Sequence, residues 1–124
     1  MGTILRCQCH VCGYKEELFV GSGLRDCEPE TVLRTAPDDP SLAKAVREGA
    51  RFQIDRDVAV CRKCRRLFAM PYVTYWPAGE TPRHTASACP ECGWLLTRLG
   101  GPVKNTACPA CGQILELTPC GHWD

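Results

Sequence analysis

Four Cys-x-x-Cys pairs constrain this chain more than any other feature of its sequence. They lie at Cys9/Cys12, Cys61/Cys64, Cys89/Cys92 and Cys108/Cys111. We term each pair with its two following residues a knuckle, so that the first to fourth knuckles are residues 9–14, 61–66, 89–94 and 108–113. One pair can bind a metal ion through two thiolates, and two pairs complete a tetrahedral site. The eight thiols therefore predict two tetracysteine metal sites.

The sequence leaves two ways to combine the four knuckles. Only fifteen residues separate Cys92 from Cys108, a spacing typical of one zinc ribbon with a strand pair between its knuckles. A longer loop costs more entropy to close, although this penalty grows slowly with length. Sequential pairing, first knuckle with second and third with fourth, is therefore the preferred interpretation. The nested alternative joins the second knuckle to the third and the first to the fourth.

A high cysteine content is also typical of disulfide-rich secreted proteins, so this class has to be considered. The chain has 11 cysteines in 124 residues, so at least one thiol would remain unpaired, and the regular spacing is that of metal chelates. Residues 1–7 lack the pattern of a secretory signal, and no apolar stretch approaches membrane-spanning length. We therefore expect a cytoplasmic protein with metal-bound thiolates and no membrane association.

Short strands are expected on both sides of the first two knuckles. Residues 3–8 and 14–20 flank the first knuckle, and the Gly13 between them suits the left-handed turn that a knuckle requires. Alternating apolar residues at 52–60 approach the second knuckle. An aromatic run at 67–76 leaves it, and is predicted to be interrupted at Pro71.

Helices are expected between the first two knuckles. Pro29 fits the first position of a short helix. Asp39 fits the N-cap of a second helix that has Pro40 at its first position and Gly49 as its stop. The sequence therefore predicts a helical insertion at about residues 24–50.

These elements indicate a small metal-bound α+β protein built from two zinc-ribbon or rubredoxin-like units of short antiparallel strands. Residues 1–78 form the first unit, which carries the helical insertion. Residues 79–124 form a compact C-terminal ribbon with a turn at residues 100–102. Glycine follows the third and fourth knuckle cysteines as it follows the first. Arg65 replaces it in the second knuckle, whose turn is expected to be less ideal.

Zinc is the expected metal, with two ions per chain in closed sites of four thiolates. Iron is the alternative, because tetrahedral sulfur ligation suits both metals. The knuckles resemble those of rubredoxins, which implies a redox-active iron. The gap between the first two knuckles is longer, and that between the last two shorter, than in rubredoxins. Cys-x-x-Cys also occurs in thiol–disulfide enzymes, but four knuckles without a thioredoxin-like strand–helix setting disfavour that chemistry.

Three further cysteines, Cys7, Cys27 and Cys120, and three histidines, His10, His84 and His122, remain to be placed. Cys120 and His122 could form a third site with Cys7 or Cys27. The preferred interpretation is that Cys27 is a small buried residue and that Cys7 and Cys120 are incidental thiols. His10 lies inside the first knuckle, where its side chain is expected to face solvent.

A basic and aromatic stretch surrounds the second knuckle. The candidate contact residues for nucleic acid or a partner are Arg62, Lys63, Arg65, Arg66, Tyr72, Tyr75 and Trp76. Cations of this kind bind phosphates, and aromatic side chains stack on bases. Four cations are few for a surface that binds nucleic acid, and the net charge of the chain is only +1. The preferred interpretation is therefore that the tip of the second knuckle is simply solvated and lies beside a half-buried strand.

Part of the sequence resembles a known family. The pattern Cys7-x-Cys9-x-x-Cys12-Gly13-Tyr14, with residues 17–23 after it, is similar to a group of small, mostly uncharacterised bacterial zinc-ribbon proteins. Those proteins share a helical segment, a second Cys-x-x-Cys and paired C-terminal knuckles. Arg65 and the tail at residues 120–124 depart from the pattern. The resemblance implies a small metal-bound protein and supplies no activity.

No catalytic constellation is recognisable in the sequence: neither a nucleophile with a positioned base, nor paired catalytic carboxylates, nor a phosphate-binding loop. We therefore predict a non-enzymatic zinc protein that acts as an interaction or adaptor module for a protein partner. The alternatives are a nucleic-acid-binding zinc ribbon that uses the basic second knuckle, and a rubredoxin-like iron protein that transfers electrons.

Overall fold

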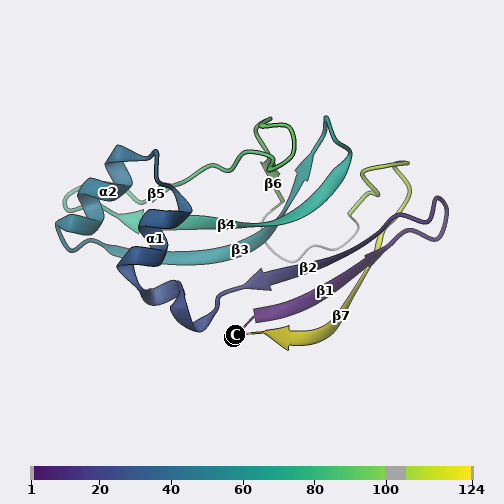
Figure 1. Ribbon diagram of the computed structural model, residues 1–124, viewed down its shortest axis with the longest axis horizontal. Coiled ribbons are helices and arrows are strands. Elements are labelled where there is room, and N and C mark those ends of the chain that lie inside the picture. The colour runs from purple at the N-terminus through teal and green to yellow at the C-terminus, as the bar shows by residue number, and fades with distance from the viewer. Residues whose placement is uncertain (1, 100–105, 124) are drawn as a thin grey trace.

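The computed structural model describes residues 2–99 and 106–123, which contain a small α+β fold (Figure 1). Its elements in chain order are β1 (Gly2–Gln8), β2 (Lys15–Gly21), the 3-10 helix η1 (Leu24–Cys27), α1 (Pro29–Thr35), α2 (Pro40–Arg47), β3 (Arg51–Cys61), β4 (Arg66–Trp76), β5 (Arg83–His84), β6 (Thr97–Arg98) and β7 (Glu116–Trp123). The expected α+β class is confirmed. The predicted turn at residues 100–102 lies outside the described residues.

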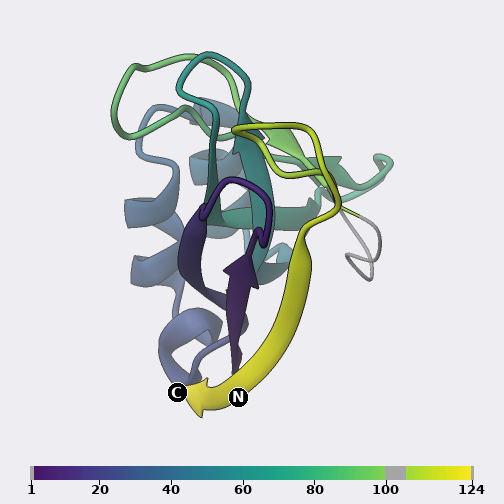
Figure 2. The same ribbon diagram turned by 90° about the vertical axis from the view of Figure 1, so that its right-hand side faces the viewer.

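The strands of the described residues belong to one antiparallel sheet with the order β5-β4-β3-β2-β1-β7, and β6 pairs with β3. β3 and β4 pair along their whole length, whereas β2 and β3 share only the pair Gly21↔Arg56. The sheet thus has two leaves, β7-β1-β2 and β3-β4 with β5 and β6. They diverge from this junction toward their turns (Figures 1 and 2).

The sheet crosses the predicted boundary between residues 1–78 and 79–124. β7 pairs with β1 from Gly2↔Trp123 to Gln8↔Glu116, and β6 pairs with β3. The division into two units stays a prediction, but strands from the two sides of the boundary form a single hydrogen-bonded sheet.

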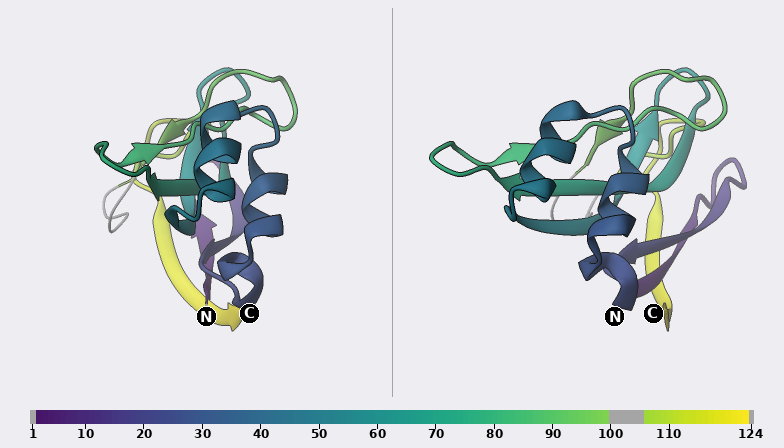
Figure 3. Two further views of the ribbon diagram at one scale, coloured as in Figure 1. Left: turned by 90° about the vertical axis from the view of Figure 1, so that its left-hand side faces the viewer. Right: turned by 60° about the vertical axis from the view of Figure 1, so that its left-hand side comes forward.

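The helical insertion begins and ends where capping residues predict. The Asp39 carboxylate accepts a hydrogen bond from the backbone N–H of Leu42 at 3.0 Å, Pro40 is the first helical residue, and Gly49 has φ = 80°. Leu42 is fully buried and packs with Ile54 of β3, so burial of this apolar side adds to the local signals. Figure 3 shows α1 and α2 on one face of the β3–β4 hairpin.

Pro71 does not interrupt the strand after the second knuckle, contrary to the sequence prediction. β4 continues through it, opposite Arg56 of β3. β5 reaches only Thr74 and Tyr75, so β4 is an edge of the sheet at Pro71 on the side away from β3, where a missing N–H breaks no ladder hydrogen bond.

The β3–β4 hairpin separates three buried clusters. One of its faces packs against the helices near Ile54 and against the first leaf near Val58 and Leu67. The other face carries Ala59 and Tyr72, which pack with Cys89 and Leu96. The alternation of side chains along the two strands produces this division. No helix in the described part of the chain is long and apolar enough to cross a membrane.

Candidate metal centres

The eight knuckle cysteines form two groups of four. In each group the sulfur atoms all lie within 4.8 Å of one another. The outer group is Cys9, Cys12, Cys108 and Cys111; the inner group is Cys61, Cys64, Cys89 and Cys92. This arrangement is nested, so the preferred sequential pairing of the knuckles was wrong and the alternative is correct.

Strand pairing explains why the longer loop closes. β1 ends at Gln8, immediately before the first knuckle, and Gln8 pairs with Glu116, shortly after the fourth. The inner group forms where the third knuckle packs against the β3–β4 face that carries Cys61. Seven residue pairs along β1 and β7 outweigh the small extra closure entropy of the longer loop.

The sulfur positions fit a tetrahedral metal ion. Sγ–Sγ distances are 3.6 Å for Cys9–Cys111 and Cys12–Cys108, and 3.6 Å and 3.9 Å for Cys61–Cys92 and Cys64–Cys89. A tetrahedron with metal–sulfur bonds of about 2.3 Å has edges of about 3.8 Å. A disulfide would require about 2.05 Å. The donor set therefore fits a bound metal, and it suits zinc and iron alike.

All four knuckles share one backbone turn. The N–H of the residue after the second cysteine donates to the carbonyl of the first cysteine at 2.8–3.1 Å, from Gly13, Arg65, Gly93 and Gly112. Arg65 has φ = 56° and is the single non-glycine residue with positive φ in residues 2–99 and 106–123. Its hydrogen bond of 2.9 Å equals that of Gly93, so the expected loss of turn geometry is absent. Arginine adopts the turn at a cost in backbone strain.

In the first and second knuckles, backbone N–H groups lower the pKa of the first cysteine. The N–H of Cys64 donates to the Sγ of Cys61 at 3.3 Å, and this bond lowers the pKa of Cys61 to about 7. Hydrogen bonds from the N–H groups of Cys12 and Val11 lower the pKa of Cys9 to about 6. A metal ligand must be a thiolate, so both shifts favour metal binding by these two sulfurs, whereas hydrogen bonding among the inner sulfurs and burial raise the pKa of Cys64 to about 12.

The two groups differ in exposure. The first cysteine of every knuckle is buried. In the outer group the second cysteines, Cys12 and Cys111, are exposed; in the inner group Cys64 and Cys92 are half-buried. The second cysteines of the inner group pack against the apolar cluster of Ala59, Tyr72 and Leu96, whereas those of the outer group lie outside the cluster that contains Cys9 and Cys108.

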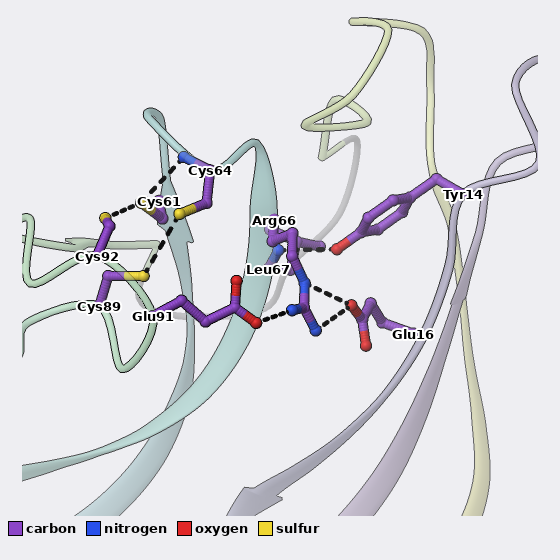
Figure 4. Close-up of polar contacts among 9 residues, drawn as sticks. All are labelled: Tyr14, Glu16, Cys61, Cys64, Arg66, Leu67, Cys89, Glu91 and Cys92. Carbon is purple, nitrogen blue, oxygen red and sulfur yellow. Dashed lines mark hydrogen bonds and ion pairs between the residues drawn. The ribbon is translucent and has the colours of Figure 1, made fainter.

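Arg66 and Tyr14 connect the surroundings of the two groups (Figure 4). The Arg66 guanidinium donates to Glu16 of β2 at 2.8 and 3.1 Å and also pairs with Glu91 of the third knuckle. The Tyr14 hydroxyl accepts a hydrogen bond from the N–H of Leu67 at 2.8 Å, and burial raises the pKa of this phenol to about 12. These contacts join the two leaves near the knuckles.

The other cysteines form no third metal centre in the described part of the chain, where the outer and inner groups are the two clusters of metal-ligating side chains. Cys7 is fully buried in the core, where burial raises its pKa to about 11. Cys27 was expected to be buried but is exposed, because it ends η1 and its thiol donates to the Leu24 carbonyl at the surface. Cys120 is exposed. His10 faces solvent as predicted, 2.6 Å from Glu116.

The proposed basic and aromatic contact residues are only partly on one surface. Arg62, Lys63 and Arg65 are exposed at the second knuckle. Tyr72 and Tyr75 are 4% and 3% exposed and belong to different clusters, so they are not available for stacking. They lie on opposite faces of β4, and both faces of this strand are covered.

Trp76 and Arg66 are likewise engaged within the protein. The Arg51 guanidinium lies 4.1 Å from the centre of the Trp76 ring, far along the hairpin from the second knuckle. Arg66 has its carboxylate partners in Glu16 and Glu91.

An exposed aromatic side chain beside the basic residues was not predicted from the sequence. Trp94 of the third knuckle is 57% exposed, and the Lys63 ammonium lies 5.4 Å from its ring centre. Its place two residues after Cys92 was visible in the sequence, but its proximity to the second knuckle follows from the nested pairing.

Comparison of the chain with protein-family models, curated proteins and solved structures found no match. The fold and the sulfur geometry define a small α+β protein with two candidate tetracysteine metal centres.

Proposed function

We propose that this chain is a non-enzymatic zinc protein that binds one Zn²⁺ in each cysteine group and acts as an interaction or adaptor module for a protein partner in the cytoplasm. The observation that carries the proposal is the pair of tetrahedral sulfur sets. Four thiolates fill the coordination shell of zinc, so neither ion would have a position for substrate. Such ions stabilise the surface around them.

Exposed apolar residues support an interaction role at the knuckles. Val11, Trp94, Leu95 and Ile114 are 57–77% exposed, and each lies in a knuckle or directly after one. The knuckles lie at the end of the molecule away from α1 and α2 (Figure 1). Exposed apolar side chains that gather at one end of a molecule support a surface that binds another protein.

Metal analysis of protein purified under reducing conditions tests the metal part of the proposal. We expect two zinc ions per chain and a colourless preparation, because Zn²⁺ has a filled d shell. Less than about one zinc per chain would contradict the proposal. A coloured preparation with iron in either group would instead favour the electron-transfer alternative.

A triple substitution tests the interaction surface. Val11→Asp, Leu95→Asp and Ile114→Asp together should abolish co-purification of a partner from the native host without changing metal content, because all three side chains are exposed. Leu24→Asp is the matched control, since Leu24 is 73% exposed on η1, outside the knuckles. Equal recovery of the same partner by both variants would exclude the knuckle surface.

A second candidate function is binding of single-stranded nucleic acid at the second knuckle. It is favoured by Lys63 and Trp94, which place a cation beside an exposed aromatic ring, with Arg62 and Arg65 exposed nearby. Cations contact phosphates and an exposed indole can stack on a base. Trp94 would take the base-stacking role predicted for Tyr72 and Tyr75, which are buried.

The test of this candidate is retention of a radiolabelled oligonucleotide at several salt concentrations. Arg62→Glu, Lys63→Glu and Arg65→Glu together should abolish retention. The control is Arg34→Glu, Lys44→Glu and Arg47→Glu, which makes the same change in charge on exposed helical residues. Unchanged retention by the knuckle variant, or equal loss in both variants, would refute specific binding at the second knuckle.

A further inference from the structure

We propose that the outer cysteine group is a site of oxidation by peroxides, at which Cys12 and Cys111 react first and the metal leaves before the inner group is affected. The inference rests on the proposed binding of zinc in both groups. It assigns different chemical behaviour to two sites that have the same four ligands.

Access to sulfur is the first difference between the groups. Cys12 and Cys111 are exposed, so a small oxidant can approach their sulfur atoms from solvent. Cys64 and Cys92 are half-buried and pack with Ala59, Tyr72 and Leu96. Oxidation of a thiolate requires direct contact between sulfur and the peroxide oxygen, and exposure therefore favours the outer group.

Charge is the second, independent difference. A zinc ion with four thiolates carries a net negative charge. The first and fourth knuckles contain no Lys or Arg, and their one basic side chain, His10, is already hydrogen-bonded to Glu116. The inner group has Arg62, Lys63 and Arg65 within its second knuckle, and the one acid of its third knuckle, Glu91, is paired with Arg66. Nearby cations stabilise electron density on sulfur and lower its nucleophilicity, so the inner thiolates should react more slowly.

The chemistry balances with a peroxide as the oxidant. A thiolate attacks the O–O bond of hydrogen peroxide, forms a sulfenic acid and releases hydroxide, which takes a proton to become water. A second thiolate attacks that sulfur, forms a disulfide and displaces hydroxide, which also becomes water. Repeating the cycle converts four thiolates, two peroxides and four protons into two disulfides, four waters and free Zn²⁺. The Sγ–Sγ distances of 3.6 Å for Cys9–Cys111 and Cys12–Cys108 are short enough for the second step.

The test uses the 124-residue chain after its zinc content has been measured, so that failure to bind two ions is recognised as failure of the proposed function. Hydrogen peroxide is then added in limiting amounts, released zinc is followed with a chromogenic chelator, and cysteines are mapped by mass spectrometry. We expect one ion to leave at least about tenfold faster than the other, a difference that a Coulomb interaction of modest size can produce. Early oxidation should map to the outer group.

Two variants test separately the outer group and the cations near the inner group. Cys12→Ser with Cys111→Ser removes the outer group; the remaining zinc should leave as slowly as the second ion of the unchanged protein. Arg62→Gln, Lys63→Gln and Arg65→Gln together should accelerate loss of zinc from the inner group. Simultaneous loss from both groups, or earlier oxidation of the inner group, would overturn the proposal. An unchanged inner rate in the neutralised variant would overturn the contribution of the cations.

Discussion

Arg65 occupies the backbone position that glycine takes in the other three knuckles. A left-handed conformation costs a residue with a Cβ about 1–2 kcal/mol, while glycine loses about 0.5–1 kcal/mol more conformational entropy on folding. We therefore expect Arg65→Gly to stabilise the metal-loaded protein by about 0.5–1 kcal/mol in denaturant unfolding. Arg65→Ala serves as control, because it removes the same charge but keeps the strain at φ = 56°.

The converse substitution tests the same physics at the fourth knuckle. Gly112 has φ = 82°, and a Cβ added there would have no atom within 4 Å. Gly112→Ala should thus destabilise the protein by about 1 kcal/mol through backbone strain alone. Equal stability of this variant and the unchanged protein would show that the knuckle turns tolerate a Cβ freely.

Asp26 is the buried charged residue of the helical insertion. It is 6% exposed, pairs with Arg56 of β3, and accepts a hydrogen bond from the Gly23 N–H at 2.6 Å. Burial alone would raise its pKa, but the hydrogen bonds from Arg56 and Gly23 outweigh burial and lower it. Asp26 is therefore ionised at neutral pH and ties η1 to the sheet beside the Gly21↔Arg56 junction.

Removal of that charge should weaken the attachment of the insertion. We expect Asp26→Asn to destabilise the protein by about 2 kcal/mol, because the buried side chain loses a charge-assisted hydrogen bond. Asp38→Asn makes the same chemical change at an exposed position and should have little effect. Chemical unfolding at pH 7 measures both, and a difference below about 0.5 kcal/mol between them would contradict the assigned role.

At the level of elements, the two leaves of the sheet depend on side chains as much as on strand pairing. β2 and β3 share one residue pair, so Tyr14 and Arg66 provide the polar contacts between the leaves near the knuckles. Tyr14→Phe would leave the N–H of Leu67 without its acceptor. We expect a loss of about 1–2 kcal/mol, the cost of an unsatisfied buried donor.

Hydrogen exchange locates the effect of Tyr14→Phe. Amide protons of β1 and β2 should exchange faster, while those in the middle of β3 and β4, which are paired to each other along their length, should keep their protection. A uniform change along the chain would indicate global destabilisation instead of separation of the leaves.

The elements themselves were largely predictable from local sequence. Pro29, Asp39 and Gly49 mark the ends of the helices, and the runs around the first two knuckles became strands. These signals act within a few residues. Pro71 misled the prediction because whether a proline interrupts a strand depends on which neighbour is hydrogen-bonded, and that is decided by the sheet as a whole.

For the whole molecule, the ligands could be predicted but not their combination. Spacing identifies Cys9 and Cys12 as a chelating pair, because both sulfurs come from one turn. Which two knuckles share a metal site depends on long-range strand pairing, here of β1 with β7. Loop entropy barely influences this pairing. The burial of Tyr72 escaped prediction for the same reason, since the third knuckle that covers it arrives through the nested arrangement.

Double cysteine substitutions distinguish the nested from the sequential arrangement in solution. Cys12→Ser with Cys111→Ser removes two ligands from one nested group and should leave one intact site, hence one tightly bound zinc per chain. Cys12→Ser with Cys64→Ser removes one ligand from each nested group, so both sites should bind weakly. Sequential pairing predicts the opposite stoichiometry for each variant, because Cys12 and Cys64 would then share a site.

The two variants control for each other, since each replaces two partly or fully exposed thiols with hydroxyls and changes core packing little. The readout is zinc retained after dialysis against a chelator of moderate affinity. One zinc in the Cys12/Cys111 variant and none in the Cys12/Cys64 variant would support the nested centres. The reverse result would mean that the fourth knuckle closes on the third and not on the first. The ladder between β1 and β7, which begins beside the first and fourth knuckles, would then have to form without a metal ion shared by those two knuckles.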